Sequence, residues 1–394
     1  MGNISKDALA LHKKYQGKLE VCAKCKVSNR QDLSLVYTPG VAEPSRVIAK
    51  NKALARKLSW SGRLVAIVSD GSAVLGLGNV GPEAALPVME GKALLMKQFA
   101  GVDAVPIVVN TQDPNEIIKL VKNISPNFAG INLEDIAAPA CFQVEDGLRN
   151  IGIPVFHDDQ HGTAIVVTAA LRNAAKVVGK PYDTMRVVIL GAGAAGLAIT
   201  RMLLGLHCFS GSCGRLKKQP SVRDVVVVDT SGALYAGREK QNIYKQAIAG
   251  ISNNKQIHGD LADVIKGADA VIGVSGRGVI TKKMISTMAP KAIVFALSNP
   301  TPEIMPEEAL RAGAKVVATG RSDFDNQINN VLAFPGLFKA VVDGGLTRIS
   351  EEMKQGAVDA IVHSVPHPTA HRIIPDPFTR GLSREVAKAV LAAK

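Results

Sequence analysis

A glycine-rich motif directly after a short apolar run constrains the fold of this chain more than any other feature. The run is Val187–Leu190, and the motif that follows it is Gly191-Ala192-Gly193-Ala194-Ala195-Gly196. An apolar segment comes next, so the glycines occupy the turn between a predicted buried strand and a predicted helix. Glycines at this spacing permit a tight turn, close approach of the backbone to a pyrophosphate, and close packing of helix on strand. The first N–H groups of the helix, at Ala194 and Ala195, would then face the phosphates. The sequence therefore predicts a Rossmann-type unit that binds a dinucleotide.

An acidic residue ends the next predicted strand. Asp229 follows Val225–Val228 and is placed to bind a ribose hydroxyl of the dinucleotide. Its separation from the last glycine is 33 residues (229 − 196), against the usual gap of about 20. The excess lies in His207–Pro220, a polar, glycine-rich stretch that we expect to be a surface loop. The carboxylate favours NAD, but Arg238 and Lys240 follow it and are available to a 2′-phosphate, so NAD and NADP both remain open.

The rest of the chain has the pattern of an α/β protein. Apolar residues make up 47% and aromatic residues only 4%, as in buried parallel strands built from Val, Ile, Leu and Ala. Further strands are predicted at Leu64–Ser69, Val105–Val109, Phe128–Leu133, Ile153–Phe156, Ala270–Gly273, Ala292–Ala296 and Val316–Thr319. Helices are predicted from Pro114, over Thr163–Val178, and at Gln355–His363 and Arg384–Ala393. We expect an N-terminal α/β catalytic and metal-binding domain (1–160), a Rossmann domain (161–335) and a C-terminal helical segment (336–394).

Four carboxylates follow two of the predicted strands. Glu134 and Asp135 come after Phe128–Leu133, and Asp158 and Asp159 come shortly after Ile153–Phe156. The carboxyl ends of strands in an open α/β sheet form its ligand crevice. The sequence therefore predicts that these acids line a site.

The overall charge limits the class of partner. The formal net charge is +13, yet the basic residues are spread along the chain with no run longer than two. Nucleic-acid binding needs clustered Lys and Arg, so we predict none, and an anionic substrate and cofactor account for the positive field. No apolar run approaches the roughly 18 residues of a membrane span, and no signal peptide opens the chain. We expect a cytoplasmic protein without membrane contact.

The five cysteines do not predict a disulfide framework, because their number is odd. Cys22 and Cys25 form a CxxC pair that has the spacing of half a zinc site. Cys208 and Cys213 are spaced more loosely. We favour reduced thiols throughout.

Two further residues have chemistry suited to proton transfer. Tyr37 lies in a loop-forming segment beside an apolar turn. Lys92 lies in Glu90-Gly91-Lys92-Ala93, which we place at the start of an apolar helix. A buried lysine acts as a base if desolvation lowers its pKa.

These features occur in an order that resembles the malic enzymes, in particular the short bacterial-type members, over nearly the whole chain. The matching segments are the Tyr37 motif, Ser69–Gly81 (SDGSAVLGLGNVG), Glu90–Lys92, Ile131–Asp135 (INLED), Phe156–Thr163 (FHDDQHGT), the glycine motif, Ser298–Thr301 (SNPT) and Gly320–Gly336 (GRSDFDNQINNVLAFPG). The longer members have an arginine soon after the Asp-Gly turn. Here Ser72-Ala73-Val74 follows that turn, so another cation must bind the carboxylate.

The resemblance implies a role for each matching residue. It implies Mg²⁺ or Mn²⁺ bound by Glu134, Asp135 and Asp159, and catalysis by Lys92 with Asp158 beside it and by Tyr37. It also implies that Asn299 and Asn330 are substrate-binding amides, with Asn299 near the cofactor as well. The implied reaction is the oxidative decarboxylation of (S)-malate to pyruvate and carbon dioxide, with reduction of NAD(P). Lys92 would take the hydroxyl proton, and Tyr37 would protonate enolpyruvate. The resemblance also implies a homodimer or a higher homo-oligomer.

Two alternatives remain at this point. The same site is chemically suited to decarboxylate oxaloacetate without net oxidation. A nucleic-acid binder with a degenerate Rossmann fold is the alternative outside enzymes, and the intact acids, Lys92 and Tyr37 argue against it.

Overall fold

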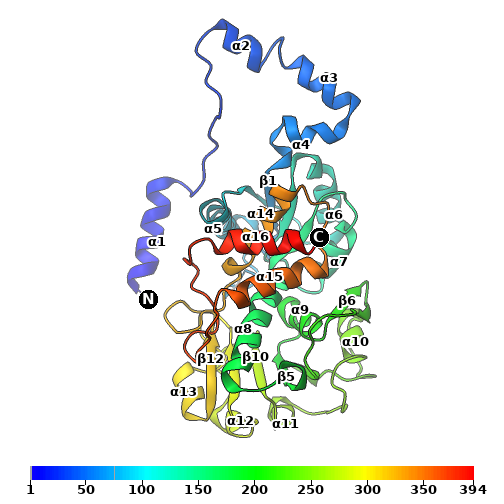
Figure 1. The fold of residues 1–394 in the computed structure, drawn as a ribbon, viewed down its shortest axis with the longest axis vertical. Helices are drawn as coiled ribbons and strands as arrows, with labels where there is room; N and C mark the ends of the chain where they lie inside the picture. The colour runs from blue at the N-terminus through cyan, green and yellow to red at the C-terminus, as the bar shows by residue number, and fades with distance from the viewer. Residues whose placement is uncertain (1, 75) are drawn as a thin grey trace.

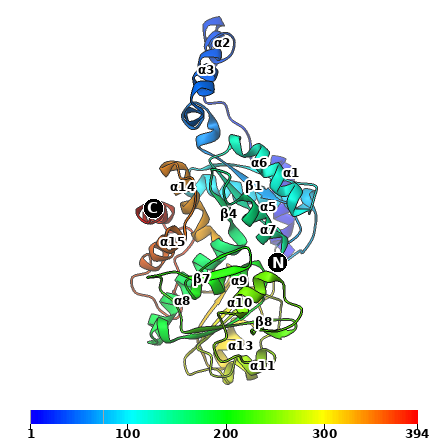
Figure 2. The ribbon, with the colours of Figure 1, turned by 90° about the vertical axis from the view of Figure 1, so that its right-hand side faces the viewer.

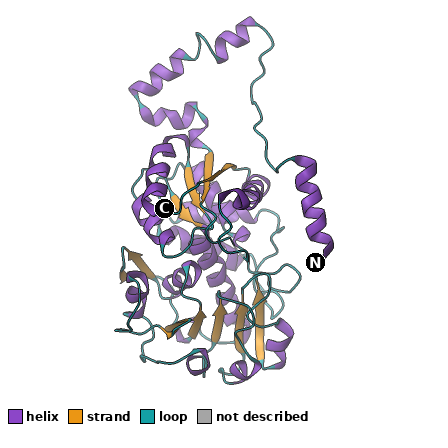
Figure 3. Cartoon of the chain, turned by 180° about the vertical axis from the view of Figure 1, so that it is seen from behind, coloured by secondary structure: helices purple, strands orange, loops and turns teal. Residues whose placement is uncertain are grey.

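The computed structural model describes residues 2–74 and 76–394 (Figure 1). Met1 and Leu75, the latter within the Ser69–Gly81 motif, lie outside the described residues. Most strands form two separate, mainly parallel sheets, one in each half of the chain, and a third sheet is a two-stranded hairpin (Figure 3). The buried helix α8 (Thr163–Val178), which was predicted with these bounds, connects the two halves.

The first sheet contains four parallel strands in the order β2-β1-β3-β4. They are β1 (Leu64–Ser69), β2 (Asp103–Val108), β3 (Gly130–Leu133) and β4 (Val155–His157). The helices of this half are α5 (Pro82–Ala100), α6 (Pro114–Ile124) and α7 (Ala140–Leu148). Chain order reverses at β1, which pairs with both β2 and β3, and such a point opens a crevice at the carboxyl ends of the strands. The four predicted acids follow β3 and β4 at that edge.

The second sheet contains six strands in the order β12-β11-β10-β5-β8-β9. The parallel strands are β5 (Arg186–Leu190), β8 (Asp224–Asp229), β10 (Ala270–Gly273), β11 (Ala292–Ala296) and β12 (Ala314–Thr319), and β9 (Gly232–Ala233) pairs antiparallel with β8. The helices are α9 (Ala194–Leu203), α10 (Ile243–Ala249), α11 (Leu261–Val264), α12 (Lys282–Ser286) and α13 (Pro306–Arg311). Because β5 pairs with both β8 and β10, the glycine motif after β5 lies at the reversal point of this sheet.

The C-terminal helices return to the first half of the molecule. They are α14 (Phe334–Gly344), α15 (Glu351–His363) and α16 (Leu382–Ala392). Helix α14 contacts α5 and β3, and α15 contacts α8. A Cβ atom at Gly130 would lie 3.1 Å from the Val341 side chain, which explains a glycine in the middle of this contact. Among the described residues, no helix is long and apolar enough to cross a membrane.

Three N-terminal helices form an arm that projects from the body (Figures 1 and 2). The arm comprises α2 (Arg30–Val36), α3 (Ala42–Lys50) and α4 (Ala55–Leu58), whereas α1 (Gly2–Tyr15) lies beside the body at the other end of a long extended segment. Helices α2, α3 and α4 contain no buried residue. Their exposed apolar side chains, with those beside them, are Leu33, Leu35, Val36, Tyr37, Val41, Leu58 and Trp60.

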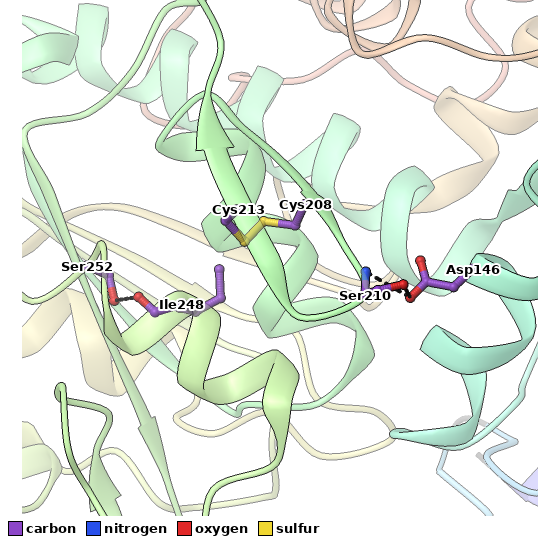
Figure 4. The surroundings of a disulfide bond; sticks show 6 residues. All are labelled: Asp146, Cys208, Ser210, Cys213, Ile248 and Ser252. Carbon is purple, nitrogen blue, oxygen red and sulfur yellow. Dashed lines mark hydrogen bonds between the residues drawn. A yellow bond between two sulfur atoms is a disulfide. The ribbon is translucent and has the colours of Figure 1, made fainter.

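The predicted loop at 207–220 is instead largely a β-hairpin, and the prediction of reduced thiols there is wrong. Strand β6 (Leu206–Phe209) pairs antiparallel with β7 (Ser212–Arg215). Ser210 and Gly211 both have positive φ, as a two-residue turn of the type favoured in hairpins requires. The hairpin register places Cys208 opposite Cys213, with Cα atoms 4.1 Å apart, and the two form a disulfide (Figure 4). Cys22 and Cys25 are free and exposed.

Candidate active site

Three of the predicted acids lie together at the edge of the first sheet. Ligand oxygens of Glu134, Asp135 and Asp159 all lie within 4.8 Å of one another. The backbone N–H of Asp135 donates to Asp159 Oδ2 at 2.8 Å, which ties the end of β3 to the segment after β4. Asp135 has a φ of 53°, so its left-handed backbone turns the chain immediately after the strand. These are hard oxygen ligands in the number that Mg²⁺ or Mn²⁺ sites use. Within the described chain, this is the only such grouping of possible metal ligands.

The acids are unfavourable as free anions. Burial raises the pKa of Asp135 to about 7, and the neighbouring Asp159 carboxylate adds to the shift. Burial also raises the pKa of Glu134 well above its ordinary value, against the opposing effect of Lys92. One oxygen of Asp135, Oδ2, is buried without a hydrogen-bond partner in the described structure. A divalent cation would satisfy that oxygen and compensate the crowded charge, so the donor set fits the predicted metal.

Lys92 lies directly against this cluster. Its Nζ is 2.5 Å from Glu134 Oε1, donates to Asp158 Oδ2, and lies 4.4 Å from the centre of the Phe334 ring. The residue is near the middle of α5, not in its first turn, because the helix already begins at Pro82. Burial alone lowers the pKa of Lys92, but the surrounding carboxylates outweigh that effect and hold the pKa above its ordinary value. The condition under which a buried lysine acts as a base, a pKa lowered by desolvation, is therefore not met by these protein groups alone.

Asp158 and Asn330 join the two halves of the chain beside Lys92. Asn330 Nδ2 donates to Asp158 Oδ2 at 3.1 Å, and Asn330 Oδ1 accepts from the Thr163 hydroxyl at 3.1 Å. A Cβ atom at Gly162 would lie 1.8 Å from Asp158 Oδ1, so the glycine makes room for the carboxylate. Of the predicted site residues, Asp158 and Asn330 are thus brought to the acid cluster.

Tyr37 is not brought to the cluster. It follows α2 on the projecting arm, and its exposed fraction is 67% (Figure 2). The prediction of a loop-forming segment is met only in part, because α2 ends at Val36 and α3 begins at Ala42. A role in the site therefore requires that the arm of one chain meet the body of another, or that the arm fold back.

The glycine motif has the geometry of a phosphate-binding turn. Gly191 has a φ of 118°, and a Cβ atom there would lie 2.6 Å from the Val274 carbonyl oxygen. A Cβ atom at Gly196 would lie 1.8 Å from the Gly191 carbonyl oxygen, so this glycine is needed for packing. Gly193 is different, because nothing in the chain lies within 4 Å of its Cβ position. No side chain caps the start of α9, which leaves the N–H groups of Ala194 and Ala195 available to a pyrophosphate.

Asp229 ends β8 as predicted, but its carboxylate already accepts hydrogen bonds from Arg238. Arg238 donates to both carboxylate oxygens, and Lys245 Nζ lies 2.6 Å from Oδ2. The pKa of Asp229 is lowered, because these hydrogen bonds outweigh the effect of burial. Lys240, the other predicted cation, is exposed.

Asn299 lies on the loop after β11, and its predicted contacts with substrate and cofactor remain predictions. A Cβ atom at Gly320 would lie 2.7 Å from Asn299 Nδ2, and one at Gly76 would lie 3.1 Å from its carbonyl oxygen. The loop is fixed by Glu303, which is fully buried and accepts from the N–H groups of Ser275 and Ser298 at 2.9 and 3.0 Å.

The sequence reading missed three positioning residues. Glu303 holds the Asn299 loop, Asn132 donates to Glu134 Oε2 at 2.8 Å, and Asp70 Oδ1 accepts from the backbone and hydroxyl of Ser72. Asp70 Oδ2 is buried without a hydrogen-bond partner in the described chain, and the residue follows the carboxyl end of β1. The signal for Asp70 was present, because it directly follows the β1 run in the way that Glu134 follows β3.

Comparison with known proteins agrees with this geometry. Residues 16–149 match the family model described as malic enzyme, N-terminal domain, and residues 160–394 match malic enzyme, NAD binding domain. The chain belongs to the malic enzyme family. The expected fold class, an α/β domain followed by a Rossmann-type domain, is confirmed.

Relatives within the malic enzyme family are similar over nearly the whole chain. The chain is 51% identical to the bifunctional malic/malolactic enzyme of Bacillus subtilis (strain 168), across 99% of this chain and 93% of that protein. It is 47% identical to the NAD-dependent malic enzyme of Geobacillus stearothermophilus, across 99% and 79%. The crystal structure of an NAD-dependent malic enzyme from Thermotoga maritima matches with a TM-score of 0.91 at 44% identity, covering 98% of each chain.

Proposed function

We propose that this protein oxidises and decarboxylates (S)-malate to pyruvate and carbon dioxide with reduction of NAD or NADP, and that it depends on a divalent metal. The observation that carries the proposal is the contact of Lys92 with the acid cluster, in a malic enzyme fold that also holds an open phosphate-binding turn. An oxaloacetate decarboxylase without redox chemistry would not need Gly193 to be kept clear.

Glu134, Asp135 and Asp159 would hold Mg²⁺ or Mn²⁺. When bound, the metal would supply Lewis acidity to an oxygen of the substrate. The N–H groups at the start of α9 would hold the pyrophosphate of the dinucleotide, whose nicotinamide would accept the hydride from C2 of malate.

Lys92 is proposed to exchange the proton of the substrate hydroxyl. The carboxylates alone favour the ammonium form of Lys92, and a divalent cation held by Glu134, Asp135 and Asp159 would offset their charge and favour the neutral amine. The lone pair of that neutral amine takes the hydroxyl proton as the hydride leaves C2, and Asp158 fixes the position of Nζ. Loss of the hydride and the proton leaves oxaloacetate, whose C3–C4 bond then breaks and releases the C4 carboxylate as carbon dioxide. The electrons of that bond form the C2–C3 double bond of enolpyruvate. Asn330, held by Thr163 and bonded to Asp158, offers an amide to a malate carboxylate.

Tyr37 is proposed to protonate C3 of the enol from a second copy of the chain. Its exposure and the apolar surface of the arm support this, because an isolated chain leaves that surface in water. A homodimer in which each arm meets the other body would both cover the apolar side chains and deliver the hydroxyl.

We also propose three domains, with limits at 1–160, 161–335 and 336–394. A cytoplasmic location is a further proposal. The return of α14 to α5 supports treating the last segment as part of the catalytic half.

A second candidate activity is the conversion of malate to lactate and carbon dioxide, which is supported by the name of the B. subtilis relative. In that reaction the hydride taken from malate returns to C2 of pyruvate, so no net reduced cofactor accumulates. Lactate formed from malate with a trace of NAD would support it, and pyruvate with equal NADH would exclude it.

The test of the main proposal is the variant Asp135→Asn. Asparagine tolerates the left-handed backbone at this position, so the fold should persist. We expect the rate of NAD or NADP reduction with malate to fall by about 10²-fold or more, while dinucleotide binding measured by fluorescence stays near that of the wild type. Asp183→Asn, which changes an exposed acid away from the cluster, is the matched control. Full activity of Asp135→Asn, or of wild type dialysed against a chelator, would contradict the metal assignment.

A further inference from the structure

A cavity of about 580 Å³ lies where the two halves of the chain meet, apart from the acid cluster. Its walls come from α7, α9, the β6–β7 hairpin and the start of α15. None of Lys92, Glu134, Asp135, Asp158 and Asp159 lines it.

Most acidic groups on the cavity wall already have partners. Glu145 Oε1 lies 2.5 Å from His161 Nε2, and Glu351 accepts from Lys354 Nζ at 2.6 Å. Asp146 accepts from the backbone N–H of Ser210 at the hairpin turn, at 3.1 Å (Figure 4). These carboxylates are therefore engaged within their own pairs.

Two guanidinium groups on the same wall have no carboxylate partner among the described residues. Arg201 lies 5.4 Å from the ring centre of Phe142, and its Nε is buried without a hydrogen-bond partner. The Arg149 guanidinium carbon lies 4.8 Å from the ring centre of Phe209, and its side-chain hydrogen bond is to the ring of His207. Across residues 2–74 and 76–394, no carboxylate forms a salt bridge with either arginine. An arginine beside an aromatic ring keeps N–H groups available to a ligand.

We propose that this cavity is a binding site for a small polyanion whose carboxylate or phosphate groups accept from Arg149 and Arg201. Planar guanidinium forks bind both groups through paired, charge-assisted hydrogen bonds. The cavity is large enough for a small metabolite, and hairpin residues form part of its lining.

The elements around the cavity connect it to both parts of the active site. Arg201 lies on α9, whose first residues form the phosphate-binding turn. His161 lies in the π-helix η4 (Asp158–Gly162), which also carries Asp159. A polyanion that bridges α7 and α9 would favour one spacing of the two halves, and so would change turnover. This regulatory part rests on the proposed function, whereas binding does not.

The test is equilibrium dialysis of the full-length protein against radiolabelled inorganic phosphate and, separately, succinate. We expect one site per chain for at least one probe, and the probe that binds identifies the ligand as a phosphate or a carboxylate. Affinity should fall about tenfold or more in Arg201→Gln and in Arg149→Gln. Arg149 is exposed, so its variant should stay folded even if the Arg201 variant does not. Arg223→Gln, an exposed arginine outside the cavity, is the matched control.

The same measurement on Asp135→Asn separates the cavity from the acid cluster. Binding that persists in this variant and is weakened in the arginine variants supports the proposal. Binding that is lost in Asp135→Asn but unchanged in Arg149→Gln would place the anion at the acid cluster and overturn it. Absence of binding by both probes at millimolar concentration would also overturn it, without affecting the proposed malate activity.

Discussion

Arg238 donates to both carboxylate oxygens of Asp229, at 2.9 and 2.7 Å, and so occupies the acid expected to bind the ribose. Lys245 adds a third contact at 2.6 Å. Two cations around one carboxylate leave this end of the dinucleotide site net positive. The acid therefore repels a 2′-phosphate less than a free carboxylate would, and the sequence argument for NAD is weakened.

The first prediction concerns this pair. Arg238→Gln should lower kcat/KM for NADP about tenfold more than kcat/KM for NAD, because it removes a cation and leaves Asp229 less compensated. Initial rates with each cofactor at saturating malate measure the ratio. Arg223→Gln, which changes an exposed arginine just before the amino end of β8, should leave the ratio unchanged. Equal losses with both cofactors would show that Arg238 acts only by holding its loop, through its bonds to the Gly232 and Ala233 carbonyls.

Two glycine variants distinguish a glycine that leaves room for the cofactor from one that is needed for packing inside the protein. Gly193→Val should weaken dinucleotide binding severely while Tm stays near the wild-type value, because the new side chain meets no protein atom. Gly196→Val should lower Tm by several degrees, since its Cβ would overlap the Gly191 carbonyl oxygen. Cofactor titration by fluorescence and thermal unfolding measure the two effects. Unchanged cofactor affinity in Gly193→Val would show that the pyrophosphate does not approach this turn.

The third prediction uses the ion pair of Glu145 with His161. Burial raises the pKa of Glu145, but His161 and Lys354 outweigh it and lower the pKa to about 2. The free carboxyl of an unfolded chain titrates near 4.3. The contribution of Glu145 to stability is therefore fully present above about pH 4.3 and is lost as the pH falls toward about 2.

Glu145→Gln should accordingly lower Tm at pH 7, and the difference in Tm between wild type and variant should narrow as the pH falls from about 4.3 toward about 2. Differential scanning calorimetry at stepped pH values gives the comparison. Glu239→Gln, which changes an exposed acid, should show no gap at any pH. A gap that widens on acidification would contradict the lowered pKa.

Local patterns in the sequence were sufficient to predict the parallel strands of the two larger sheets and the edge at which the acids gather. β10, β11 and α8 have the predicted bounds, because each is an apolar run whose length and flanking residues admit one interpretation. The acids after β3 and β4 meet because parallel strands end at the same edge of a sheet.

Features that depend on contacts distant in sequence were not predictable. Lys92 was placed at a helix start, whereas α5 already begins at Pro82 and continues through Pro87. The net effect on its pKa depends on how many carboxylates converge from other elements. The hairpin at β6–β7 depends on two residues with positive φ, and the pairing of Cys208 with Cys213 follows only from its register.

The position of Tyr37 relative to the acid cluster could not be predicted from the sequence for another reason. Its predicted role depends on a contact that an isolated chain does not make. Its motif was recognised by resemblance, while the structure leaves it on an exposed arm. If the arm serves a second chain, Tyr37→Phe and Lys92→Ala should each be inactive alone and should complement each other when mixed. The phenyl ring retains the packing of Tyr37 and loses only the proton donor, so the assembly itself should be preserved.

Random exchange of two inactive homodimers makes half of the dimers mixed, and each mixed dimer would contain one site with both Lys92 and Tyr37 intact. We therefore expect about a quarter of wild-type activity after unfolding and refolding the two variants together at equal concentration. Refolding each variant alone is the control and should restore none. Light scattering should report a dimer in every sample. If the mixture stays inactive while dimers form, Tyr37 does not act across the interface, and if Tyr37→Phe alone keeps full turnover, its hydroxyl is not the proton donor.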